Sequence, residues 1–284
     1  MLKSRRDFLK TTALGAGMAG VARYLHAGTV AKAGKNSKWE IKLGVASYSL
    51  REFSRGEAIK MINALRTPYV NIKSFHLPYE SSPEELAAGR HEFEAAGLTI
   101  VGGGNNNIQE DTDEHVRMFF EYGKSCGMPL LVISPTPENL PRIEKFVKQY
   151  DIKVALHNHG PEDKYFPGPK DALKLIKDMD PRVGLCVDVG HTTRTGADVV
   201  QEIAAAGSRV LDMHIKDLKD LMLKESQCIV GEGAMPIPEI FAQLQKMKYA
   251  GYVNLEYEID KDDPLPGMKQ SFAYMRGVLA GLAL

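Results

Sequence analysis

From residue 40 onward, short apolar runs alternate with longer stretches in which apolar residues recur at helical spacing. The runs are brief, rich in Val, Ile and Leu, and bounded by Gly, Pro, Asn or Asp, which is typical of strands buried on both faces. Eight runs are predicted as strands, at residues 41–46, 69–73, 99–102, 130–133, 153–157, 183–188, 210–214 and 252–256.

The stretches between the predicted strands carry helix start signals. Ser82-Pro83-Glu84-Glu85 begins one of them, acidic residues at 111–114 begin another, and Gly168-Pro169 precedes a third. Proline or an acidic residue in the first turn favours helix entry. Strands that alternate with helices imply a parallel sheet with right-handed crossovers, because parallel strands need a crossover connection.

Eight strand–helix units in a chain of 284 residues favour a closed barrel over an open doubly wound sheet. After the first predicted strand the chain reads Gly44-Val45-Ala46-Ser47, which is not the glycine-rich phosphate loop of a dinucleotide fold. No long linker or low-complexity tract interrupts the pattern. We therefore predict an α/β fold, a single (β/α)8 TIM barrel over residues 40–284.

The N-terminus has a different pattern. Residues 4–10 read Ser-Arg-Arg-Asp-Phe-Leu-Lys and resemble the twin-arginine export signal. The Gly/Ala-rich stretch at 11–25 is too short for a membrane-spanning helix of roughly 20 residues. Two small-residue cleavage sites, at 25–27 and 31–33, remain open. We predict an export signal over residues 1–33, a periplasmic or exported protein and no stable membrane anchor; the alternative is an ordinary basic amphipathic helix.

Charge and cysteine usage narrow the function classes. The 36 basic and 36 acidic residues cancel, and no basic patch with interleaved aromatics is present, so nucleic acid is not expected as a partner. The three cysteines lack CxxC spacing, which argues against a disulfide framework and a cysteine zinc site. Cys186, in an apolar run, is predicted to be a small buried side chain. The expected partner is a small-molecule sugar, and a homo-oligomer is compatible with the sequence.

In a (β/α)8 barrel the active site forms at the C-terminal ends of the strands. Five of the eight histidines fall at these ends, namely His76, His157, His159, His191 and His214. Asp188 ends the predicted strand that leads to His191, and Glu256 ends the eighth predicted strand. Mixed imidazole and carboxylate ligands suit Mn, Co, Fe or Zn and argue against calcium. We predict one divalent metal ion, with Mg not distinguished from these, held by Asp188, His214, Glu256 and His157.

Such an ion, bound to adjacent oxygens of a sugar, polarises the carbonyl and stabilises the ene-diolate formed when a C–H proton leaves. Glu256 and His157 are candidates for the group that removes and returns the proton, and a ligand role is open for both. Lys216 and Lys73 would bind substrate oxygens or, alternatively, form salt bridges with Asp217 or a neighbouring helix. The predicted catalytic residues are Glu256, His157, His191 and Lys216, and the predicted substrate contacts are His76, His159, Lys73, Asn105 and Tyr48.

These segments resemble the xylose-isomerase-like TIM barrels, specifically the sugar phosphate isomerase/epimerase family. The resemblance covers residues 40–284 and is most specific at 186–192, 213–217 and 231–256. It implies that Asp188, His214 and Glu256 hold the metal and that His191 contacts substrate. The fifth strand departs from the family, because His157 stands where the epimerases have a glutamate.

This departure removes one of the two glutamates by which those epimerases exchange protons on opposite faces of a carbon. A histidine base suits isomerisation, or the elimination and hydration steps of a 3-keto sugar. Export and the lack of a phosphate cradle favour an unphosphorylated substrate. We predict a metal-dependent isomerase or epimerase of an unphosphorylated sugar or keto-sugar. A lyase or hydratase of 3-keto-sugars or keto-glycosides and a non-catalytic carbohydrate-binding barrel are the alternatives, and the related endonuclease branch is disfavoured by the neutral charge.

Overall fold

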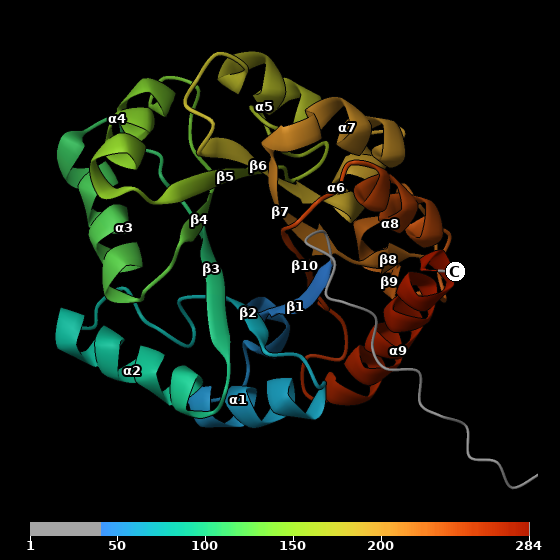
Figure 1. Cartoon of the computed structure of the whole chain (residues 1–284). Coiled ribbons are helices and arrows are strands. Elements are labelled where there is room, and N and C mark those ends of the chain that lie inside the picture. The colour runs from blue at the N-terminus through green and yellow to red at the C-terminus, as the bar shows by residue number, and fades with distance from the viewer. Residues whose placement is uncertain (1–40, 284) are drawn as a thin grey trace, which may run out of the picture. The chain divides into compact units, whose positions relative to one another are not determined.

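Eight parallel strands close into a ring in the computed structural model, which describes residues 41–283 (Figure 1). Around the ring the order is β1, β10, β7, β6, β5, β4, β3 and β2. The strands are β1 Lys42–Ala46, β2 Tyr69–Ile72, β3 Thr99–Asn106, β4 Leu130–Ile133, β5 Lys153–His157, β6 Val183–Asp188, β7 Val210–Ile215 and β10 Tyr252–Leu255. The predicted (β/α)8 TIM barrel is confirmed.

Helices surround the ring and follow its strands in the chain (Figure 1). The predicted start signal at Ser82 is an N-cap, as is Ser54, and each of the two serines forms a capping box with the glutamate three residues later. The helices are α1 Arg55–Ala64, α2 Pro83–Ala95, α3 Asp113–Ser125, α4 Leu140–Tyr150, α5 Pro169–Ile176, α6 Val189–Arg194, α7 Val199–Ala206, α8 Ile237–Lys246 and α9 Leu265–Leu282. Three 3-10 turns are η1 Ser47–Leu50, η2 Gly207–Arg209 and η3 Lys224–Ser226.

Strand β3 is longer than predicted and runs to Asn106 rather than ending at residue 102. The buried Asn106 amide donates to the carbonyl oxygens of Gly103 at 3.0 Å and Val132 at 2.9 Å, and its oxygen accepts from the Tyr79 hydroxyl at 2.8 Å. These bonds extend the strand and bring Asn105 to the C-terminal mouth of the barrel.

The connection after β7 contains a short antiparallel pair that the sequence pattern did not predict, β8 Asp217–Leu218 with β9 Gln227–Cys228. The buried Asp217 carboxylate organises this connection by accepting from the backbone N–H groups of Gly231, Gly233 and Met235 at 2.9–3.1 Å. Asp217 is therefore occupied by its own loop and forms no ion pair with Lys216. The loop also carries η3, which borders the cavities described below.

Apolar side chains fill the space between the strands and the surrounding helices, including fully buried Phe93, Phe120 and Phe241. The three cysteines are buried and form no disulfide. The burial of Cys186 was predicted from the apolar run in which it lies. Within residues 41–283, no helix has both the length and the apolar character to cross a bilayer. The predicted export signal at residues 1–33 lies outside the described part of the chain.

Candidate metal centre and active site

Four predicted ligands meet at the C-terminal mouth of the barrel. His157 and Asp188 end strands β5 and β6, His214 lies in β7, and Glu256 directly follows β10. Asp188 and His214 are paired in register, so adjacent parallel strands carry their side chains to one level. Each of the four buried residues offers a ligand atom, and these atoms all lie within 4.8 Å of one another.

The donor atoms face each other closely. His157 Nε2 lies 3.0 Å from His214 Nδ1 and 3.7 Å from Asp188 Oδ2, and His214 Nδ1 lies 3.3 Å from Glu256 Oε2. Asp188 Oδ2 is buried and, apart from the Lys216 ammonium 3.1 Å away, has no hydrogen-bond partner among the described residues, so it can accept a bound cation. Two imidazole nitrogens and two carboxylates form a donor set that fits a first-row divalent ion such as Zn, Co, Fe or Mn.

A second grouping replaces the two carboxylates by Cys186, which lies beside His157 and His214. Burial, with the nearby Asp212 carboxylate, raises the pKa of the Cys186 thiol well above its ordinary value. The Cys186 thiol already donates to Asp212 Oδ2 at 3.8 Å. The grouping with Asp188 and Glu256 is the better metal site.

A buried ammonium neutralises part of this acidic centre. Lys216 Nζ lies 3.1 Å from Asp188 Oδ2 and 3.0 Å from Glu256 Oε2, and it also donates to Glu258. Burial opposes the charge of Lys216, but the three carboxylates prevail and raise its pKa well above the ordinary value. Lys73 Nζ, at 3.4 Å from Glu256 Oε1, approaches the same carboxylate from β2.

Nearby positively charged groups keep the Glu256 carboxyl ionised. Burial alone would raise its pKa, but His214, Lys216 and Lys73 together hold the pKa of Glu256 well below its usual range. A carboxylate with so low a pKa is a poor proton acceptor and a good cation ligand. The geometry thus favours the ligand role among the two roles that the sequence left open for Glu256.

A cavity of about 300 Å³ opens at the barrel mouth beside His157 and Glu256, and we call it the mouth cavity. Four of the five predicted substrate contacts line it, namely Tyr48, Lys73, Asn105 and His159. The predicted catalytic residues His157, His191 and Glu256 also line it, together with Ser74, Phe75, Gly104, Lys224 and Glu258. Polar groups surround the cavity on several sides, which suits a ligand with many hydroxyl groups.

The fifth predicted contact, His76, lies behind the wall of this cavity. Its ring is 1% exposed, and its nitrogens contact Ser47 Oγ at 3.0 Å and the Leu50 carbonyl oxygen at 3.1 Å. Both partners belong to η1, which carries Tyr48. His76 is not among the residues that line the cavity and instead fixes the turn that presents Tyr48.

His76 makes the stability of the fold depend on pH, because burial lowers the pKa of its ring below the ordinary value near 6.5. Below pH 6.5 the unfolded chain therefore binds a proton that the folded chain refuses, so stability falls as the pH falls, by up to about 1.4 kcal/mol per pH unit for this group. We expect His76→Gln to show a smaller loss of stability than wild type between pH 7.5 and 5.5 in urea unfolding. The exposed His91→Gln is the control, and equal losses in all three proteins would contradict this reading.

His159 lines the cavity with a ring whose unprotonated nitrogen accepts a hydrogen bond from Asn105. Asn105 Nδ2 donates one hydrogen to Ser134 Oγ at 2.6 Å and the other to His159 Nε2 at 3.0 Å, while His159 Nδ1 lies 3.4 Å from Asp163 Oδ2. This arrangement places the ring proton on Nδ1 and the lone pair on Nε2. Burial lowers the pKa of His159, against the pull of Asp163, so the ring is neutral at neutral pH.

His191 differs from His159 because the proton of its neutral ring lies on Nε2 instead of Nδ1. Its backbone N–H donates to Asp188 Oδ1 at 2.8 Å in the first turn of α6, and Arg194 Nη1 lies 3.1 Å from its Nδ1. Arginine only donates, so His191 Nδ1 accepts and Nε2 carries the proton of the neutral ring. Glu162 accepts a hydrogen bond from Arg194 and holds it in place. The site therefore has one imidazole acceptor and one imidazole donor.

Sequence reasoning missed three residues of the site. Glu258 follows Glu256 by two positions, and Arg194 follows His191 by three, so their spacing along a strand end and a helix turn was an available signal. Lys224 lies in the connection after β7, whose short antiparallel pair was not predicted, and no local sequence pattern pointed to this lysine.

Comparison with known proteins agrees with this architecture. The family model described as a xylose isomerase-like TIM barrel matches residues 56–278. A curated relative, the inosose dehydratase of Mesomycoplasma hyopneumoniae, is 26% identical over 162 residues, which are 50% of this chain and 53% of that protein. The chain spans about half the length of the curated relatives it matches.

Two solved structures share the fold. The crystal structure of the IOLI protein with a bound zinc atom has a TM-score of 0.71 and 17% identity, covering 85% of this chain and 99% of that one. The 3-keto-D-glucoside 4-epimerase YcjR from E. coli has a TM-score of 0.65 and 17% identity, covering 84% of this chain and 100% of that one. At these identities the structures establish the likeness of fold.

Proposed function

This chain belongs to the xylose isomerase-like TIM barrel family, and we propose that it is a metal-dependent isomerase or epimerase of an unphosphorylated sugar or keto-sugar. One observation carries the proposal: His157, Asp188, His214 and Glu256 converge beneath a polar cavity at the barrel mouth. The relatives' names, a dehydratase and an epimerase, support sugar chemistry at such a site.

In this proposal His157 is a ligand, because its Nε2 faces the other three donor groups. A divalent cation, when bound there, supplies an electrophile that stabilises negative charge on adjacent sugar oxygens. His159 Nε2, once the substrate displaces the Asn105 amide from its lone pair, removes the C–H proton and returns it. The Lys216 ammonium balances the charge that develops on oxygen, and His191 Nε2–H holds a substrate hydroxyl.

The test has two steps on the purified full chain. Elemental analysis measures the metal per protein, and NMR in D₂O then follows deuterium entry into a panel of ketoses and keto-sugars. The proposal expects one equivalent of metal and deuterium in the recovered sugar, with exchange abolished by a chelator. Metal-loaded protein that exchanges no proton of any panel member would refute it.

A lyase or hydratase acting on 3-keto-sugars or keto-glycosides is the second candidate. The observation that favours it is a single imidazole base, His159, in the same cavity as Glu258, which pairs with the Lys216 ammonium, instead of two opposed carboxylates. Elimination needs one base and one proton donor for the leaving group. An unsaturated product formed with loss of a C–O bond would select this candidate. Sugar binding without metal and without exchange would select the non-catalytic barrel.

The donor set also predicts a metal preference that His157 controls. Imidazole nitrogens favour Zn and Co, whereas carboxylate oxygens suit Mn and Mg. We expect His157→Glu to raise the bound Mn-to-Zn ratio on the order of tenfold over wild type in competition dialysis. His159→Gln, outside the four-ligand cluster, should leave the ratio unchanged. Equal ratios in wild type and His157→Glu would show that His157 is not a ligand.

A further inference from the structure

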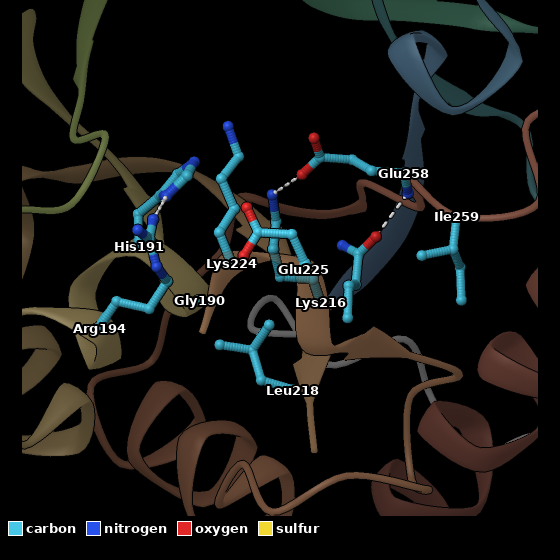
Figure 2. A pocket seen from close by; sticks show the side chains of 10 residues that line it. Gly190, His191, Arg194, Lys216, Leu218, Lys224, Glu225, Glu258 and Ile259 are labelled. Atoms are coloured by element: carbon cyan, nitrogen blue, oxygen red, sulfur yellow. Dashed lines mark hydrogen bonds and ion pairs between the residues drawn. The ribbon is translucent and has the colours of Figure 1, made fainter. Parts of the chain in front are cut away.

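Figure 2 shows a second cavity of about 180 Å³. It borders the mouth cavity, because His191, Lys224 and Glu258 line both. Its other walls include Gly190, Leu218 and Ile259. We call this second cavity the side compartment. Two neighbouring compartments suit a ligand made of two parts.

The side compartment differs from the mouth cavity because Arg194, Lys216 and Gln227 on its walls are already paired, whereas Lys224 and Glu225 are exposed to solvent. Gln227 donates to the Glu256 carbonyl oxygen at 3.0 Å and accepts from the Glu258 N–H at 2.7 Å. Arg194 is held by Glu162 and His191, as Figure 2 shows for the His191 contact. These groups have little capacity left for ligand hydroxyls, and the aliphatic surfaces remain for contact.

Gly190 shapes one wall of the compartment. A Cβ at this position would lie 2.8 Å from Lys216 Cγ and Cδ, closer than side chains tolerate. The missing side chain lets the Lys216 stem lie along the first turn of α6 while its ammonium reaches Glu258. The stem thereby adds aliphatic surface beside Leu218.

The volume limits what can enter. An apolar protein cavity on the order of 150 Å³ accepts benzene, so the side compartment accommodates about one six-membered ring. We propose that the side compartment binds an apolar ring joined to the sugar, so that the substrate is a keto-glycoside, with a ketone on its sugar ring and an aromatic or alicyclic aglycone. This rests on the proposed function, because it takes the sugar ring to occupy the mouth cavity. Lys224, exposed at the boundary of both cavities, is placed to contact the linking oxygen.

Matched glycoside pairs test the proposal by calorimetry on the metal-loaded full chain. The probes are phenyl and methyl glycosides of glucose, galactose and xylose in both anomeric forms. We expect the phenyl member of at least one pair to bind about tenfold more tightly than its methyl partner, because burial of the ring removes apolar area from water. Equal affinity within every pair, or no binding of any glycoside, would overturn the proposal.

Two variants locate the effect in the side compartment. Ile259→Trp fills the compartment and Ile259→Ala removes a wall contact, so each should reduce the phenyl preference while the affinity for the methyl glycoside changes less than about twofold. Ile229→Trp is the matched control, since Ile229 is also partly buried but lines neither cavity. Equal weakening of phenyl and methyl binding by both Ile259 variants would overturn the assignment.

These measurements separate the inference from the proposed function. A protein that exchanges deuterium into a ketose but shows no phenyl preference contradicts the side compartment alone. A protein that prefers phenyl glycosides but exchanges no proton supports the side compartment and contradicts the proposed chemistry.

Discussion

Asp188→Asn and His214→Asn are each expected to lower metal affinity by more than about a hundredfold and to abolish turnover. Both side chains offer a donor atom to the four-residue cluster, and both are 0% exposed, so water cannot replace them readily. Asparagine at 188 keeps an oxygen that can accept from the His191 N–H and so preserves the N-cap of α6. The change therefore removes the charge and leaves the local fold.

Elemental analysis after dialysis, metal titration and the D₂O exchange assay measure the outcome. Asp171→Asn, in the first turn of α5, is the control for loss of a helical carboxylate at the surface. Thermal unfolding without metal should show that all variants are folded. Full metal occupancy in both Asp188→Asn and His214→Asn would refute the metal centre.

The local pattern was enough to predict the barrel and the four residues that meet at its mouth, His157, Asp188, His214 and Glu256. Each of the four follows or ends an apolar run, and the eight runs fixed which end of the sheet they share. Asp188 and His214 pair in register because parallel neighbouring strands begin and end together. These four residues followed from fold geometry, and none of them needed a long-range contact to be found.

His76 and His159 show where this reasoning ends. Both follow a predicted strand, yet one ring binds η1 behind the wall and the other faces the cavity. The difference is set by partners distant in sequence, Ser47 for His76 and Asn105 for His159. The partners of Lys216 could not be predicted from the local sequence either, because Glu258 and Asp188 reach it from other strands. Side-chain direction depends on contacts that a local pattern does not contain.

The charge balance of the centre makes Lys216→Met the most informative second variant. In the wild type its buried ammonium contacts Asp188, Glu256 and Glu258, and the variant leaves these carboxylates without their main counter-charge. Removing one partner of a buried ion pair destabilises a protein by about 3–5 kcal/mol, so the metal-free variant should be markedly less stable. Metal should bind at least as tightly as in wild type, and it should restore more stability to the variant because a cation then relieves the repulsion.

Turnover should fall by about a hundredfold or more in Lys216→Met although the metal remains, because the group that balances developing negative charge is gone. Thermal unfolding with and without chelator, metal affinity and kcat measure the three effects separately. Lys219→Met, an exposed lysine three positions further on, is the matched control and should match wild type in all of them. Loss of metal from Lys216→Met, as in Asp188→Asn, would instead make Lys216 part of the structure that assembles the ligands. Unchanged kcat would remove it from the chemistry, because a spectator ammonium can be lost without cost to the transition state.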